Sequence, residues 1–257
     1  MVSNIAFILC QLAVFALLII ILIGFESEII MGKSDKIILL GFDGLGSHNL
    51  VTVSNLTNFQ YLLSHGMWTL DAKTDNIVLS GPNWVGILSG CNSDKSRVYD
   101  NECVLPRCNT LLTDESAVYT EWDNIKCYSE NIGLYKYSHR PNITTIMSVI
   151  DSKYKFVFLH LDELDAIGHS YTADNILYKN KLKQLDDEVL GPIIDYVKSK
   201  HATLIITSDH AFDLDGYGHS GLPVPLILYG KGIYKGKIER MTRNSDVFEY
   251  INKLTDD

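Results

Sequence analysis

Short apolar runs alternate with amphipathic stretches along most of the chain after its first 35 residues. The continuous runs at 36–41 (KIILLG), 156–161 (FVFLHL) and 202–207 (ATLIIT) are typical of buried strands in a parallel sheet. In the stretch 173–200, apolar residues recur at steps of three and four, which predicts a long amphipathic helix. This alternation predicts an α/β fold, with a mostly parallel central sheet and helices on both faces.

The same pattern predicts further elements between and after these runs. Strands are expected at 67–72 and 225–229, and helices at 49–64, 82–89, 145–150 and 246–254, the last with Asp246 as its cap. The stretch from Cys91 to Tyr137 has little periodicity, so we expect a loop-rich insertion there.

The N-terminal segment differs from the rest of the chain, because residues 5–25 contain no charged side chain. About 20 apolar residues span a bilayer core, whereas the core of a signal peptide is usually about 7–15 residues long. We therefore expect residues 1–25 to form one hydrophobic helix, an uncleaved signal anchor rather than a cleaved signal peptide. Residues 26–35 would be a juxtamembrane linker and 36–257 a single folded domain, which would be secreted if the anchor were cleaved.

Four cysteines cluster in the expected insertion, at Cys91, Cys103, Cys108 and Cys127. An even number of cysteines in a membrane-directed chain favours two disulfides, with three possible pairings, over four reduced thiols. The triplets that begin at Asn55 and Asn142 fit the N-glycosylation pattern. Together these features predict a domain on the lumenal or extracellular side of the membrane.

The charge balance limits the partners of the chain. It has 22 basic and 31 acidic residues, a formal net charge of −9. This excess of negative charge repels phosphate backbones, so we expect no binding of nucleic acids. It still permits an anionic small molecule as substrate, because bound cations invert the local field.

Carboxylates and histidines follow three of the predicted strands. These side chains are Asp43 after the first run, Asp165 and His169 after the second, Asp209 and His210 after the third, and His219 shortly downstream. Because ligands of such sheets bind beyond the carboxyl ends of the strands, we expect the six side chains to meet at one edge. Asp and His are suitable zinc ligands, and six of them fit two ions. Two ions about 3.5–4 Å apart can stabilise the attacking and leaving oxygens of a phosphoryl displacement.

A candidate nucleophile lies in the segment 79–84 (LSGPNW). Ser80 precedes a proline that starts a predicted helix, and a helix N-terminus favours an anion. A metal ion would lower the pKa of the Ser80 hydroxyl and activate it, while the amide of Asn83 would donate to a phosphate oxygen. Taken alone, the segment is also typical of a plain helix cap.

Taken together, these motifs resemble the alkaline phosphatase superfamily, and most of all its type I phosphodiesterase/nucleotide pyrophosphatase branch. The matching pieces are GFDG, SGPNWVGILSG, DAIGH, SDH and GHSG, in the order of the family. The resemblance implies two zinc ions, one held by Asp43, Ser80, Asp209 and His210 and the other by Asp165, His169 and His219. It also implies a phospho-serine intermediate on Ser80, with Asn83 as phosphate donor, and a hydrolase acting on phosphodiester, pyrophosphate or phosphomonoester bonds. Its substrate would be a phosphate ester of a small molecule or a lipid.

Three related classes are the alternatives to this hydrolase. A sulfatase needs an arginine where this chain has Trp84. Lumenal phosphoethanolamine transferases share a similar segment but generally have many transmembrane helices. The third class is an inactive relative that binds metal or a partner. Around the predicted site we expect Asp162 to orient a ligand histidine or to cap a strand, His160 to be a core residue, and Trp84 to pack or to line the pocket.

Overall fold

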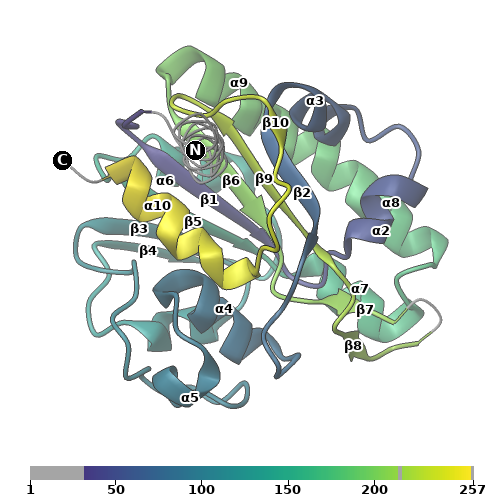
Figure 1. Cartoon of the computed structure of the whole chain (residues 1–257), viewed down its shortest axis with the longest axis horizontal. Helices are drawn as coiled ribbons and strands as arrows, with labels where there is room; N and C mark the ends of the chain where they lie inside the picture. The colour runs from purple at the N-terminus through teal and green to yellow at the C-terminus, as the bar shows by residue number, and fades with distance from the viewer. Residues whose placement is uncertain (1–31, 214–215, 256–257) are drawn as a thin grey trace, which may run out of the picture.

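The computed structural model describes residues 32–213 and 216–255, and within them it contains an eight-stranded mixed sheet (Figure 1). In spatial order the strands are β10 (Gly236–Lys237), β2 (Met67–Ala72), β9 (Val224–Gly230), β6 (Thr203–Thr207), β1 (Ile37–Phe42), β5 (Phe156–Leu161), β3 (Ser116–Thr120) and β4 (Leu134–Tyr137). Strand β9 pairs antiparallel with both β2 and β6, and the other pairs are parallel. The predicted α/β fold with a mostly parallel sheet is confirmed.

Helices cover both faces of this sheet (Figure 1). Alternate residues of β1 point to opposite sides, as in any strand, and divide the core in two. Ile38 and Leu40 pack with helices α3 (Thr57–His65), α6 (Ile143–Ile150), α8 (Ile176–Leu185) and α9 (Gly191–Lys200). Ile37 and Leu39 pack with α4 (Ser80–Ser89) and α10 (Val247–Thr255). The two-sided burial explains why β1 is apolar throughout.

Two predicted helices are interrupted in the structure. The stretch 49–64 forms α2 (Ser47–Thr52) and then α3, with a turn between them at which Asn55 has a φ of 63°. The stretch 173–200 forms α8 and α9, joined by a π-helical turn, η2 (Asp186–Leu190). The carboxylate of Asp186 accepts hydrogen bonds from the backbone N–H groups of Asn58 and Phe59, at 3.1 and 2.9 Å, so this turn is attached to the start of α3.

The insertion 91–137 is more regular than its sequence suggests, and the prediction of a loop-rich segment is wrong in part. It contributes β3 and β4 to the central sheet, together with the short helices α5 (Ser93–Ser96) and η1 (Asp123–Tyr128). Its cysteines pair as Cys91–Cys108 and Cys103–Cys127. Such bonds are characteristic of proteins outside the cytosol, as the cysteine count led us to expect.

The predicted N-terminal helix and most of the predicted linker lie outside the described residues. Within 32–213 and 216–255, no helix has the length and apolar character needed to cross a membrane.

Candidate metal centre

The structure brings the seven residues predicted as metal ligands to the carboxyl ends of the parallel strands. Gly41 of β1 is level with His160 of β5 and with Thr207 of β6. Asp43 and Asp209 each lie two residues beyond this level, so they leave the sheet side by side. Their role as ligands stays a prediction, but the geometry that it needs is present.

One group of ligand atoms comes from Asp43, Asp209 and His210, which are almost completely buried. Donor atoms of the three residues all lie within 4.8 Å of one another. His210 Nε2 is 3.3 Å from Asp43 Oδ1 and 3.1 Å from Asp209 Oδ2. Gly44 has a φ of 77°, which favours glycine, and its N–H donates to Asp209 Oδ1 at 3.2 Å. This turn therefore holds the two carboxylates against each other.

A second group contains Asp165, His169 and His219. Helix α7 (Glu163–Tyr171) carries Asp165 and His169 one turn apart, and β8 (His219–Ser220), the partner of β7 (Ala211–Phe212), carries His219. His219 Nε2 lies 3.2 Å from Asp165 Oδ1 and 2.8 Å from His169 Nε2. The His219 ring stacks on the ring of His210, with centroids 3.5 Å apart, so the two groups adjoin.

The carboxylates of this centre repel one another. Burial, followed by the charges of Asp209 and Asp165, raises the pKa of Asp43 well above its ordinary value. Burial and the charge of Asp165 raise the pKa of Asp209 to about 8. Burial also lowers the pKa of His210 to about 4, which keeps the imidazole neutral, the form that binds metals. The buried carboxylates therefore need a bound cation to neutralise their charges.

Unpartnered atoms support the same conclusion. Asp209 Oδ2 and Asp165 Oδ1 are buried and receive no hydrogen bond of regular geometry from the described residues, although the ring nitrogens of His210 and His219 lie 3.1 and 3.2 Å away. Buried carboxylate oxygens without donors are uncommon in folded proteins unless they bind an ion. Together with the neutral imidazole of His210, they fit divalent cations that prefer oxygen and nitrogen ligands.

Ser80, the predicted nucleophile, lies beside the first group of ligand atoms. It is the first residue of α4, and its Oγ lies 3.2 Å from His210 Nε2 and 3.5 Å from Asp43 Oδ1. Only 6% of its surface is exposed. The hydroxyl thus borders the Asp43–Asp209–His210 group, as predicted for a ligand that is also a nucleophile.

The sequence led us to expect that the amide of Asn83 faces the metal centre, but in the structure it does not. Asn83 is completely buried, and its Nδ2 donates to the backbone oxygens of Ile77 and Leu79, at 2.7 and 3.0 Å. Its Oδ1 accepts from Asp75 N and Asn244 Nδ2. Because both amide hydrogens are used, Asn83 braces the start of α4 and presents no free donor.

Asn101 is a residue that sequence reasoning missed. It is exposed, and its Oδ1 accepts a 2.7 Å hydrogen bond from the N–H of Gly81, the residue after Ser80. Its side chain therefore lies at the first turn of α4, although it comes from the disulfide-tied insertion. No periodic pattern in the sequence marks this position.

Trp84 and His160 both contact the carboxylate of Asp43, a role beyond the packing that the sequence led us to expect. Trp84 Nε1 donates to Asp43 Oδ2 at 2.9 Å, and His160 Nε2 lies 3.1 Å from the same oxygen. A side chain at Gly41 would overlap the Trp84 ring, so glycine is needed there. Burial lowers the pKa of His160 to about 4, so a neutral ring donates through Nε2 while its Nδ1 faces the Thr120 hydroxyl at 3.3 Å.

Within the described residues, the side chain of Asp162 makes no hydrogen bond to a predicted ligand histidine. One of its carboxylate oxygens lies within 4.8 Å of donor atoms of Asp43 and His160. Burial, and after it the charge of Asp43, raises the pKa of Asp162 to about 7. Its backbone N–H donates to Glu121, so Asp162 belongs to the surroundings of the centre.

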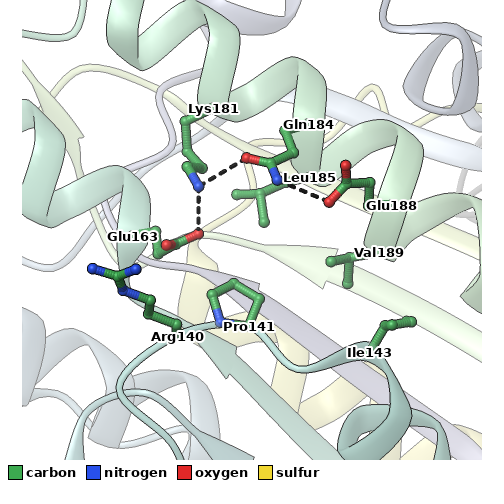
Figure 2. Close-up of a pocket in the computed structure, with 9 residues that line it drawn as sticks. All are labelled: Arg140, Pro141, Ile143, Glu163, Lys181, Gln184, Leu185, Glu188 and Val189. Atoms are coloured by element: carbon green, nitrogen blue, oxygen red, sulfur yellow. Dashed lines mark hydrogen bonds and ion pairs between the residues drawn. The ribbon is translucent and has the colours of Figure 1, made fainter.

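A separate pocket of about 260 Å³ lies beside the start of α7. Figure 2 shows Lys181 between Glu163 and Gln184, with Gln184 also bonded to Glu188. The ion pair of Lys181 with Glu163, at 3.0 Å, joins α8 to the helix that carries Asp165. None of the predicted metal ligands lines this pocket.

Comparison with known protein families matches residues 112–253, more than half of the chain, to the metalloenzyme superfamily. The chain belongs to the metalloenzyme superfamily. The match includes five of the predicted ligands: Asp165, His169, Asp209, His210 and His219. The superfamily predicted from the motifs is confirmed.

Among known proteins with similar sequences, 2,3-bisphosphoglycerate-independent phosphoglycerate mutase of Thermococcus gammatolerans is 36% identical over 81 residues, 32% of this chain. The matched segment covers only 19% of that mutase. A similar mutase of Saccharolobus islandicus is 40% identical over 76 residues, 29% of this chain and 17% of its own length.

Solved structures show the same fold. Murine ectonucleotide pyrophosphatase/phosphodiesterase 5 aligns with a TM-score of 0.69 and 14% identity, over 85% of this chain and 94% of its own. The alkaline phosphatase of the Antarctic bacterium TAB5 aligns with a TM-score of 0.64 and 12% identity, over 87% and 98% of the two chains. The fold is therefore alkaline-phosphatase-like.

Proposed function

We propose that this protein is a metal-dependent hydrolase of phosphodiester, pyrophosphate or phosphomonoester bonds that works through a phospho-serine intermediate. The observation that carries the proposal is the place of Ser80. Its hydroxyl starts a helix and borders a group of carboxylates and histidines whose buried, unpartnered oxygens fit cations. The alkaline-phosphatase-like fold and the superfamily support it.

The residues divide the work as follows. Asp43, Ser80, Asp209 and His210 would hold one ion, and Asp165, His169 and His219 the other. Zinc is the ion that best suits these oxygen and nitrogen donors, and when bound it would act as a Lewis acid on the phosphoryl oxygens and on the Ser80 hydroxyl. The Ser80 oxygen forms a bond to phosphorus as the bond to the leaving oxygen breaks. Water then cleaves phospho-Ser80 and restores the hydroxyl.

In this proposal Asn101, rather than Asn83, orients the phosphate group. Asn101 is an exposed residue whose amide oxygen bonds the first turn of α4, whereas both hydrogens of the Asn83 amide are used inside the protein. A donor placed where charge develops in the transition state is an effective catalytic group.

The place of action is also part of the proposal. The paired cysteines and the apolar N-terminal segment favour a catalytic domain held at a membrane on its lumenal or extracellular side. Asn55 and Asn142, both exposed, are the proposed glycosylation sites.

The test is hydrolysis of bis(p-nitrophenyl) phosphate by the zinc-loaded protein and by Ser80→Ala. We expect the variant to lose turnover while it keeps its zinc and its circular dichroism spectrum, because a single oxygen is removed from a folded site. Unchanged turnover would refute the nucleophile, and zinc binding without any turnover by the wild type would support the inactive, metal-binding alternative.

A further inference from the structure

One buried tyrosine differs from the others in having no partner for its hydroxyl. Tyr128 is 1% exposed, and its hydroxyl makes no hydrogen bond to any described residue. By contrast, the hydroxyl of Tyr119 donates to Arg140 O, that of Tyr178 donates to Gly44 O, and that of Tyr250 accepts from Arg240. Buried polar groups are normally bonded, so an unbonded one needs an explanation, and a bound ligand is one such explanation.

The free hydroxyl points at the nucleophile helix. It lies 3.1 Å from the position that a Cβ atom on Gly81 would occupy, and Gly81 follows Ser80 directly. Burial, followed by the charges of Asp43 and Asp209, raises the pKa of Tyr128. The phenol is therefore close enough to the metal centre for the charges of its carboxylates to affect the phenol pKa. The phenol keeps its proton and remains a hydrogen-bond donor.

The backbone and ring of Tyr128 are held firmly. It ends helix η1, next to Cys127, which is bonded to Cys103. Its carbonyl oxygen accepts from Thr110 Oγ1 at 2.9 Å, and its ring contacts the ring of Trp122 edge-on, with centroids 6.3 Å apart. These contacts place the Tyr128 ring, and with it the hydroxyl, inside the disulfide-tied insertion.

We propose that Tyr128 donates a hydrogen bond to an oxygen of the phosphate group bound at Ser80. The ligand class is a phosphoryl group, as ester or as free phosphate, and the proposal rests on the function proposed above. A hydrogen bond from a neutral hydroxyl to an anionic oxygen is stronger than one between neutral groups. A donor held in place in this way also needs little reorganisation during the reaction. The disulfide-tied insertion would then supply substrate contacts from both Asn101 and Tyr128.

The test compares Tyr128→Phe with Tyr119→Phe, each of which removes one buried hydroxyl. Tyr128→Phe is expected to keep or raise the melting temperature, because no bond within the protein is lost, while kcat/KM for bis(p-nitrophenyl) phosphate falls about 100-fold. Tyr119→Phe is expected to do the opposite, with a lower melting temperature and unchanged kcat/KM, because its hydroxyl bonds the backbone of Arg140 and Asn142 and its ring belongs to the other core cluster.

A second measurement separates this proposal from the proposed function. Inorganic phosphate is titrated calorimetrically into the zinc-loaded wild type and Tyr128→Phe, after zinc contents are shown to be equal. Weaker phosphate binding by the variant supports the contact even if the wild type hydrolyses no ester, an outcome that would defeat only the proposed function. Equal phosphate affinity, or a melting temperature that falls as in Tyr119→Phe, overturns the role of Tyr128.

Discussion

Replacing His160 tests whether the proposed metal site depends on a residue that is not itself a proposed ligand. His160 is completely buried, and its Nε2 lies 3.1 Å from Asp43 Oδ2. Trp84 donates to the same oxygen, which leaves Oδ1 of Asp43 facing His210 and Ser80. We therefore expect His160→Leu to free the Asp43 carboxylate to rotate away from the position in which it binds the ion.

The size of the effect follows from the bond that is lost. A hydrogen bond to a charged group contributes about 1.5–3 kcal/mol. Loss of a residue that orients a metal ligand typically lowers metal affinity about 10–100-fold. The two scales agree, because a tenfold change in affinity is about 1.4 kcal/mol. We expect His160→Leu to lower zinc affinity about 10–100-fold and to lower turnover at limiting zinc.

Zinc affinity is measured by competition with a chromogenic chelator at neutral pH. His160→Gln, whose amide N–H can reach the same oxygen, should recover much of the affinity. His139→Leu removes an exposed histidine whose ring bonds Tyr137, and should bind zinc like the wild type. If folded His160→Leu also binds zinc with wild-type affinity, the contact does not position Asp43 and the reasoning fails.

Three further predictions concern the surroundings of the site. Burial raises the pKa of Glu121 to about 8. The folded state therefore keeps a proton that the unfolded chain loses above about pH 4.3, so stability is full below that pH and is lost as pH rises toward about 8. In urea titrations of the metal-free protein, Glu121→Gln should abolish a loss of a few kcal/mol between about pH 5 and 8, and parallel profiles would contradict this. Chelation should stop turnover and lower the melting temperature, because the folded chain loses the binding free energy of the ion and the buried carboxyls of Asp43 and Asp209, whose pKa values are raised, take up protons in its place. Added zinc should restore both, and turnover in excess chelator would exclude a metal-dependent reaction. Asn83→Ala should lower the free energy of unfolding by about 1–3 kcal/mol for each buried partner left unpaired. Asn101→Ala should lower kcat with little change in melting temperature. The reverse outcome would restore Asn83 as the phosphate donor.

Much of the fold could be predicted from the sequence, because buried strands and amphipathic helices carry a periodic pattern. Strands β2 and β5 have the predicted bounds, and β6 and β9 differ from theirs by one residue at the ends. The pattern failed at 116–120 and 134–137, where two short strands sit inside a polar, disulfide-rich segment. It also missed the turn at Asn55 and the π-helical turn at Asp186, both of which depend on local backbone geometry.

The candidate ligands were predictable for the same reason. In a parallel sheet the carboxyl ends of the strands meet at one edge, so Asp43, Asp165 and Asp209 had to come close once the strands were identified. The sequence by itself determined this meeting, as well as the presence of histidines beside the carboxylates.

Only the tertiary structure decided what surrounds those ligands. The bonds of Trp84 and His160 to Asp43 join segments 41 and 117 positions apart. The direction of the Asn83 amide depends on how one helix starts, and the unbonded hydroxyl of Tyr128 depends on how the insertion packs. Such contacts have no period, because each one depends on rotamers and packing at a single place rather than on a repeated face. The strands determine where the metal centre lies, and these unpatterned contacts determine which side chains can meet a substrate there.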